Sequence, residues 1–184
     1  MNAKAAEILF HPQPCGHIVY PYNDESQLAE AVGLFAGAGL GRGEAVLLIM
    51  TAPHCGPLLE SLASSGFDVK ALQESGQLVC EEAETLLSTF LFDGIVDEQV
   101  FKSKISGMIE KAKALCGPRK VRVFGEMVSL TWRSRQQATE RLEELWNEVI
   151  AEHQVPLLCA YALAGTRPQE FPASLLACHS HSVA

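Results

Sequence analysis

The sequence predicts an α/β fold of three layers, with a doubly wound, mostly parallel sheet and helices on both of its faces. Apolar runs of strand length alternate along the chain with amphipathic segments of helical length. The run AVLLIM at 45–50 is continuously apolar, which is typical of a strand buried on both faces. Residues 121–163 read as strand, long amphipathic segment and strand, the order expected when a helix crosses between parallel strands.

Each predicted element is bounded by residues that start or stop it. Asn, Asp and Pro favour helix starts, because their side chains cap or pre-shape the first turn, whereas Gly and Gly-Pro end helices. In the first half we expect a strand at 17–20, a helix capped by Asn23-Asp24 and ended by the glycines of 37–43, a strand at 45–51, a helix with Pro53 in its first turn that ends at 64–66, and a weaker strand at 77–80. In the second half we expect a helix to about 92, a helix capped by Asp97 and ended by Gly117-Pro118, a strand at 121–127, a helix from about 134 to 153, a strand at 157–163, and a last helix from about 170 to 178.

Length and composition favour one globular domain. A chain of 184 residues can bury roughly 70% of its unfolded surface. Residues 1–16 contain two prolines and no periodicity, so we expect a loosely ordered leader before a single domain at 17–184. The six cysteines are widely spaced without a C-x-x-C pair, which favours free thiols over a disulfide framework.

Charge and hydropathy disfavour two classes of partner. The formal net charge is -8 and no basic stripe is present, so direct nucleic-acid binding is not expected. The chain has no apolar run of about 18 residues and no secretory signal. We therefore expect a cytoplasmic protein without a membrane partner.

The glycine-rich segment at 37–44 does not form a working phosphate loop. A Walker A loop requires Lys and Ser or Thr after its last glycine, and neither follows Gly41 or Gly43. The segment also precedes a strand, whereas a phosphate loop follows one. It is better interpreted as a helix end and turn.

Four residues are candidate ligand contacts: His17, Tyr20, Glu126 and Trp132. Glu126 ends a predicted strand, and ligands of open α/β sheets bind at that edge. A structural ion pair with Arg122 or with an arginine of 133–141 is an equally good interpretation of Glu126. His17 and Tyr20 point to opposite faces of a regular strand, and His17 could equally be structural.

The sequence contains no catalytic motif and no complete metal motif. Neither a G-x-S-x-G elbow nor H-E-x-x-H occurs, so no catalytic residue is assigned and an enzyme is not expected. No cofactor is expected either. Cys178, His179 and His181 are weak metal candidates, because structural zinc sites need four ligands and no second cluster accompanies them.

Four segments resemble the MEDS domain, a family of sensory domains named for methanogen and methylotroph proteins and a dichloromethane-metabolism regulator. The first is His17-x-x-Tyr20, and the second is Gly39-Leu40 with Gly43-Glu44. The third is one long block that contains FGEMV (124–128) with Trp132, then LEELWN (142–147), then LLCAY (157–161). The fourth is the closing Cys178-His179-Ser180-His181. Departures occur at Glu82-Ala83, at Thr131 and Arg133-Ser134, and at Ser182–Ala184. These departures affect what can be expected about the identity of the ligand, and they do not affect the expected fold.

The resemblance implies a RecA-like α/β domain with a degenerate phosphate loop. It implies a non-enzymatic sensor that binds a small molecule, for example a simple hydrocarbon derivative. The sensor would signal through a separate histidine kinase or transcription regulator. Two alternatives remain: a RecA-like nucleotide-binding protein, and a ligand-free interaction module such as a homodimer that pairs through an exposed helix face.

Overall fold

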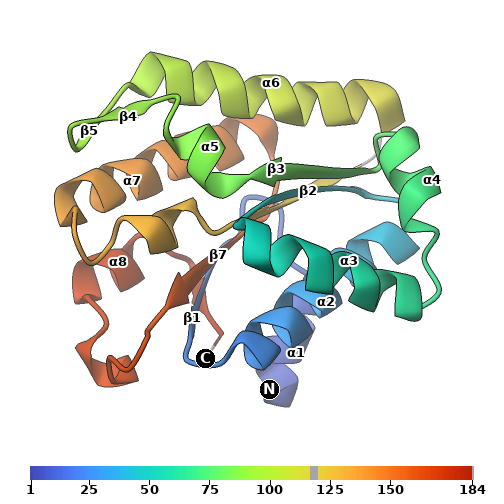
Figure 1. Ribbon diagram of the computed structural model, residues 1–184, viewed down its shortest axis with the longest axis horizontal. Coiled ribbons are helices and arrows are strands. Elements are labelled where there is room, and N and C mark those ends of the chain that lie inside the picture. Colours follow the sequence, from blue (N-terminus) through green and yellow to red (C-terminus); the bar gives the residue numbers. More distant parts are fainter. Residues whose placement is uncertain (117–119, 184) are drawn as a thin grey trace.

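A computed structural model describes residues 1–116 and 120–183 and is built around a six-stranded, all-parallel sheet (Figure 1). The strand order is β3-β2-β6-β7-β1-β8. The strands are β1 (His17–Tyr22), β2 (Ala45–Met50), β3 (Leu78–Glu82), β6 (Val121–Gly125), β7 (Leu157–Ala162) and β8 (His181–Ser182). A separate antiparallel ribbon pairs β4 (Leu91–Phe92) with β5 (Ile95–Val96). The predicted α/β class with a parallel sheet is confirmed.

Helices cover both faces of the sheet, which gives the predicted three layers (Figure 1). The α2 face is covered by α1 (Ala3–Phe10), α2 (Glu25–Gly41) and α3 (Ala52–Ser64), with α4 (Val69–Glu74) beside β3. The α7 face is covered by α5 (Ala83–Leu87), α6 (Glu98–Cys116), α7 (Gln136–His153) and α8 (Ala173–Ala177). Two short 3-10 helices follow β6 and β7: η1 (Met127–Leu130) and η2 (Pro168–Glu170).

Strand β2 shows why its sequence is continuously apolar. Leu47 and Ile49 pack into the core of the α7 face, whereas Leu48 and Met50 pack into the core of the α2 face. Successive side chains of a strand alternate between faces, so a central strand with helices on both sides needs apolar residues at every position. No helix in the described part of the chain is long and apolar enough to cross a membrane.

Several predicted helix boundaries are confirmed by their caps. Asp24 accepts a hydrogen bond from the Ser26 N–H at 2.7 Å at the start of α2. Asp97 accepts one from the Val100 N–H at 3.1 Å before α6. Gly43 has a φ of 75° where the chain turns from α2 into β2, a conformation that favours glycine. The expected stop at 117–118 lies outside the described residues.

The amino-terminal leader differs from the expectation of loose order. Asn2 caps α1 by accepting a hydrogen bond from the Ala5 N–H, and Ala5 and Leu9 are buried against the α2 face. The two prolines follow the helix rather than interrupt it. Amphipathic spacing over only eight residues was too short to distinguish from an irregular segment.

Three further elements differ from the prediction. The helix expected to reach about 92 ends at Leu87, and the chain enters the β4–β5 ribbon. The last helix spans only Ala173–Ala177, after η2. The edge strand β8, which pairs with β1, was not predicted because two residues carry no strand pattern.

Arg122 is buried at the amino-terminal side of the sheet and does not contact Glu126. Its guanidinium forms an ion pair with Glu44 and donates hydrogen bonds to the carbonyl oxygens of Leu9 and Phe35, at 3.2 and 3.1 Å. Four residues of strand, at about 3.3 Å each, separate Arg122 from Glu126 by roughly 13 Å. The pairing between them that the sequence suggested is therefore wrong.

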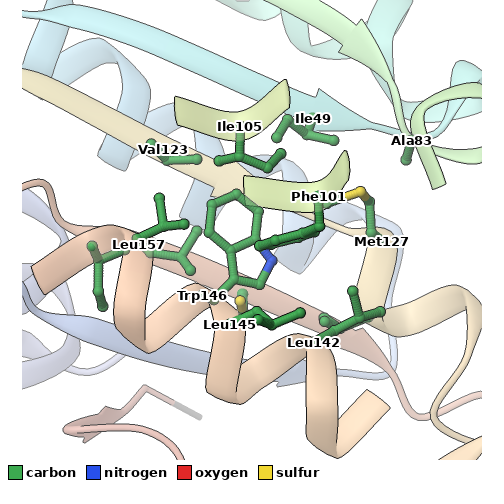
Figure 2. Close-up of a cluster of buried hydrophobic side chains, with 14 of the residues drawn as sticks. Ile49, Ala83, Phe101, Ile105, Val123, Met127, Leu142, Leu145, Trp146 and Leu157 are labelled. Atoms are coloured by element: carbon green, nitrogen blue, oxygen red, sulfur yellow. The ribbon is translucent and has the colours of Figure 1, made fainter. Parts of the chain in front are cut away.

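The core of the α7 face is centred on Trp146 (Figure 2). Its ring meets the Phe101 ring edge-on, with centroids 5.4 Å apart, so that α6 and α7 are locked together over the sheet. Figure 2 shows Ile105, Val123 and Leu157 around the same ring.

Candidate functional site

The carboxyl ends of β2 and β6 form a topological switch point. The two strands are neighbours in the sheet, but the chain leaves β2 into α3 on the α2 face and leaves β6 through η1 into α7 on the other face. Because the two connections part, the ends of such strands open a crevice where ligands of α/β folds bind. Thr51 and Glu126 are the first residues beyond these strand ends.

Glu126 is the centre of a buried hydrogen-bond network at this crevice. Its Oε2 accepts bonds from the Thr51 N–H at 2.9 Å and from the Thr51 hydroxyl at 3.2 Å. Its Oε1 lies 2.7 Å from His54 Nδ1 and accepts a longer bond, 3.5 Å, from the Tyr22 hydroxyl. Only 1% of Glu126 is exposed. A buried carboxylate is tolerated where donors replace its water, and four donors do so here.

The Glu126 carboxylate also serves as the acceptor for the amino terminus of α3. Thr51 precedes this helix but makes no capping bond with its own side chain, and Pro53 lies in the first turn. The amino terminus of a helix carries unpaired N–H groups and a partial positive charge, and so it is the usual position for a bound phosphate. An anion of the protein itself already occupies that position.

His54 presents one ring nitrogen to the outside of the network. A carboxylate only accepts, so the Nδ1 that faces Glu126 carries a proton, and Nε2 of the neutral ring bears a lone pair. Nε2 lies 3.8 Å from Oε1 of Glu25, a largely exposed carboxylate. Burial, Glu126 and Glu25 together raise the pKa of Tyr22, which keeps its hydroxyl protonated as a donor.

A small cavity lies beside His54, between α2 and α3. Its volume is about 60 Å³. Its wall is apolar except at one end; it is lined by Leu28, Ala29 and Val32 of α2, Met50 of β2, Pro53, Pro57 and Leu58 of α3, and the polar Glu25 and His54. An apolar pocket with a few convergent polar groups is typical of small-molecule sites, although most are larger.

A larger hollow lies next to this cavity, and Ala29 lines both of them. It measures about 590 Å³ and lies over α2 and α3, where Gly33, Gly37 and Gly41 line its floor. It is open to solvent, and its polar lining residues are exposed side chains. We favour the smaller cavity as the candidate site because only it adjoins a buried polar network at the switch point.

The structure does not bring the four predicted contact residues to one site. Only Glu126 belongs to the network. Tyr20 points into the α2 face and donates to the Gln27 carbonyl at 3.2 Å, although its ring stacks beside that of Tyr22. Trp132 is buried on the α7 face against Phe171 and does not line the cavity.

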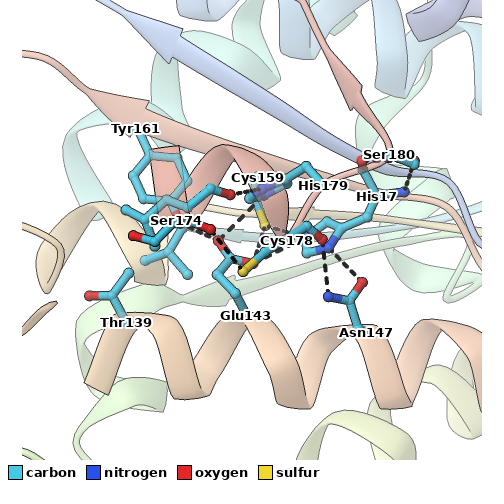
Figure 3. Close-up of polar contacts among 12 residues, drawn as sticks. His17, Thr139, Glu143, Asn147, Cys159, Tyr161, Ser174, Cys178, His179 and Ser180 are labelled. Carbon is cyan, nitrogen blue, oxygen red and sulfur yellow. Dashed lines mark hydrogen bonds and ion pairs between the residues drawn. The ribbon is translucent and has the colours of Figure 1, made fainter. Parts of the chain in front are cut away.

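His17 lies in a different cluster, on the α7 face (Figure 3). There it meets Glu143, Cys159 and His179, whose donor atoms all lie within 4.8 Å of one another. Of the three tail residues considered for metal, only His179 belongs to this group. Cys178 bonds the Ser174 carbonyl instead, and Nδ1 of His181 bonds the Ser180 hydroxyl beside it.

Sequence reasoning missed Tyr22, Thr51 and His54 at the crevice. One signal could have found two of them, because Thr51 and His54 immediately follow the most clearly buried strand. The residues just beyond such a strand lie at the ligand-binding edge by the same rule that singled out Glu126.

Comparison with known proteins identifies one family. A family model described as "MEDS: MEthanogen/methylotroph, DcmR Sensory domain" matches residues 16–180. A comparison with curated proteins gave no match.

Proposed function

Since the chain belongs to the MEDS family of sensory domains, matched over residues 16–180, we propose that it is a non-enzymatic, cytoplasmic sensor whose small-molecule ligand binds in the cavity beside His54. The observation that carries the proposal is the buried Glu126 network, which holds one imidazole nitrogen toward an otherwise apolar cavity at the switch point.

The cavity favours a small neutral or cationic hydrocarbon derivative with one hydrogen-bond donor, such as a short alcohol or alkylamine. Its volume of about 60 Å³ admits only a few non-hydrogen atoms without rearrangement. The lone pair on His54 Nε2 accepts a hydrogen bond, and the Glu25 carboxylate next to it repels anions. Organic acids and phosphates are therefore disfavoured.

Signalling would follow from a shift between two arrangements of the crevice. A ligand bonded to Nε2 fixes the His54 ring, and Glu126 links that ring to Thr51 at the start of α3 and to Tyr22 at the end of β1. A ligand that prefers one arrangement of these segments shifts the population toward it. The output would be a surface read by a separate histidine kinase or transcription regulator, with a homodimer as the simplest assembly.

The same geometry counts against the alternatives. A nucleotide phosphate would compete with Glu126 for the amino terminus of α3. Catalysis by His54 on Thr51 is disfavoured, because the Thr51 hydroxyl lies 3.0 Å from Nδ1, the nitrogen that carries the proton, and not from the basic Nε2. A ligand-free interaction module would leave the cavity without a role.

Filling the cavity should remove the ligand response. We expect that a short alcohol or amine at about 100 times its Kd adds roughly 2.7 kcal/mol and raises the unfolding midpoint of the wild type by several degrees. Ala29→Phe places a ring in the cavity from α2 and should eliminate that rise. The measurement is a thermal-unfolding screen of both proteins against alcohols, amines, halocarbons, organic acids and Mg²⁺ with ATP or GTP.

The matched control is Ala38→Phe, on the same helix but lining only the larger hollow. It should keep the wild-type response. A rise that survives in Ala29→Phe would place the ligand elsewhere. A rise with nucleotides alone would support the nucleotide-binding alternative, and no rise with any compound would support the interaction module.

Glu126→Gln should weaken binding without filling the cavity. The neutral amide turns an NH₂ group toward the Thr51 N–H or the His54 Nδ1–H, so one donor faces another and the imidazole loses its fixed orientation. We expect affinity for the stabilising compound to fall about tenfold, and the free energy of unfolding to fall by about 1–3 kcal/mol. Calorimetric titration measures the first and urea unfolding the second. Glu60→Gln, on the exposed side of α3, is the control, and unchanged affinity in Glu126→Gln would remove Glu126 from the site.

A further inference from the structure

A second polar cluster is buried on the sheet face opposite the His54 cavity (Figure 3). His17 begins β1, Glu143 lies on α7, Cys159 lies in β7, and His179 follows α8. At most 2% of the His17, Glu143 and His179 side chains is exposed, and Cys159 is fully buried. Four segments distant in sequence thus place two imidazoles, a carboxylate and a thiol together inside the protein.

Four distances between donor atoms are close to the edge lengths of a tetrahedral zinc site, with Glu143 contributing one or the other of its two oxygens. His17 Nε2 lies 3.1 Å from Glu143 Oε2 and 3.3 Å from Cys159 Sγ. Cys159 Sγ lies 3.8 Å from Oε2, and His179 Nε2 lies 3.4 Å from Oε1 of the same carboxylate. A zinc ion held tetrahedrally at ~2.0–2.3 Å from each ligand requires ligand-to-ligand distances of ~3.3–3.8 Å.

Both histidines are oriented by bonds at their other ring nitrogen. His17 Nδ1 lies 3.0 Å from Oδ1 of Asn147, whose amide group is in turn fixed because its Nδ2 donates to the Cys178 carbonyl. His179 Nδ1 lies 2.7 Å from the Leu175 carbonyl, which can only accept. Nδ1 therefore carries a proton in both rings, and each neutral ring presents the lone pair of Nε2 to the cluster. Outer partners of this kind orient the histidine ligands of metals.

The Nε2 atom of His179 is the least satisfied polar atom of the cluster. It is buried and has no hydrogen-bond partner among the described residues. It faces the Glu143 carboxylate, so two acceptors oppose each other unless the ring carries a second proton or a metal ion lies between them. A divalent cation would also balance the buried charges, because one carboxylate and one thiolate together carry two negative charges.

A purely hydrogen-bonded cluster explains less of this arrangement. The Tyr161 hydroxyl donates to Glu143, and the Cys159 thiol can donate to His17 Nε2. These bonds give His17 and part of the carboxylate hydrogen-bond partners, but they leave Nε2 of a neutral His179 ring without a donor.

We propose that His17, Glu143, Cys159 and His179 bind one divalent ion of the zinc class in a closed, tetrahedral, structural site. Two imidazoles, a thiolate and a carboxylate are borderline donors that suit Zn²⁺ and exclude Mg²⁺ and Ca²⁺. Four protein ligands leave no open position for chemistry. The site goes beyond the proposed sensor function and replaces the expectation of a protein without a metal. Of the tail candidates Cys178, His179 and His181, it retains only His179.

The ion would tie the carboxyl-terminal segment to the sheet. His179 follows α8 directly and precedes the edge strand β8, whereas the other three ligands lie on β1, α7 and β7. Removal of the ion should therefore loosen residues 173–183, with increased amide hydrogen exchange there and less change in β2 and β6.

The test is metal analysis of the full chain purified without chelators, followed by chelation and titration with Co²⁺ alone. We expect about one equivalent of zinc as isolated. The chelated protein should bind one equivalent of Co²⁺, with the visible bands of tetrahedral cobalt and a near-ultraviolet thiolate-to-cobalt band. Cys159→Ser should lose the thiolate band, and His179→Gln should bind Co²⁺ at least about tenfold more weakly. Cys80→Ser, which changes a half-buried thiol on β3, is the control and should keep the wild-type spectrum.

Wild-type protein that contains no metal and gives no tetrahedral Co²⁺ spectrum would overturn the proposal. So would a thiolate band that persists in Cys159→Ser. If a variant does not fold, the wild-type titration decides, because the Co²⁺ spectrum itself reports the thiolate and the geometry. None of these outcomes depends on binding at the His54 cavity.

Discussion

Replacement of Arg122 by alanine is expected to lower the free energy of unfolding by about 3–5 kcal/mol. The guanidinium is 3% exposed, pairs with Glu44, and donates to the carbonyl oxygens of Leu9, in the last turn of α1, and of Phe35, inside α2. Its removal leaves a mostly buried carboxylate without a partner and takes this donor from the Leu9 carbonyl at the end of α1. Urea unfolding of the wild type and of Arg122→Ala measures the difference.

Two further variants distinguish the effect of an unpaired buried charge from the effects of lost packing and of losing a surface charge. Arg122→Leu combined with Glu44→Leu removes both charges and should cost less than Arg122→Ala, because no unpaired charge remains. Arg167→Ala removes an exposed arginine paired with Glu170 and should change stability by less than about 1 kcal/mol. A loss below 1 kcal/mol for Arg122→Ala would contradict the assigned role of the pair.

The second large effect is expected at Trp146. The side chain is 1% exposed and fills the space between α6, α7 and the sheet (Figure 2). Trp146→Ala should lower the free energy of unfolding by about 3–5 kcal/mol, because the transfer energy of the ring is lost and a cavity remains beside Phe101. Phe92→Ala is the control, since that ring is 57% exposed on β4, and it should cost well under 1 kcal/mol. Equal losses in the two variants would contradict the packing described for α6 and α7.

The layers and the central strands could be predicted because their signals are local. Because β2 is covered on both faces, it requires an apolar residue at every position, and its six consecutive residues are all apolar. The position of Glu126 at a strand end follows from the same pattern. Its contacts with His54 and Tyr22 could not be predicted in this way. Those residues lie on other elements, and the hydrophobic pattern does not determine the order of the strands in the sheet.

The cluster of His17, Glu143, Cys159 and His179 was even harder to predict, because its members are far apart in the sequence. His17 and His179 lie 162 positions apart and meet only because β8 pairs with β1 at the edge of the sheet. Glu143 carried a readable signal, since it falls on the buried stripe of α7 between Thr139 and Trp146 at helical spacing. A charged residue on an apolar stripe requires a partner, and the sequence alone did not identify which one.

The most direct test of the proposed sensor site is the imidazole signal of His54 during titration with the alcohol or amine that stabilises the protein most. A ¹H–¹³C correlation spectrum resolves the ring Cε1–H groups, and the His54 signal is assigned by its loss in His54→Gln. If the ligand binds beside Nε2, the His54 signal should shift saturably while those of His17 and His179, on the opposite face of the sheet, stay in place. Saturable binding that leaves His54 unmoved would contradict the proposed site.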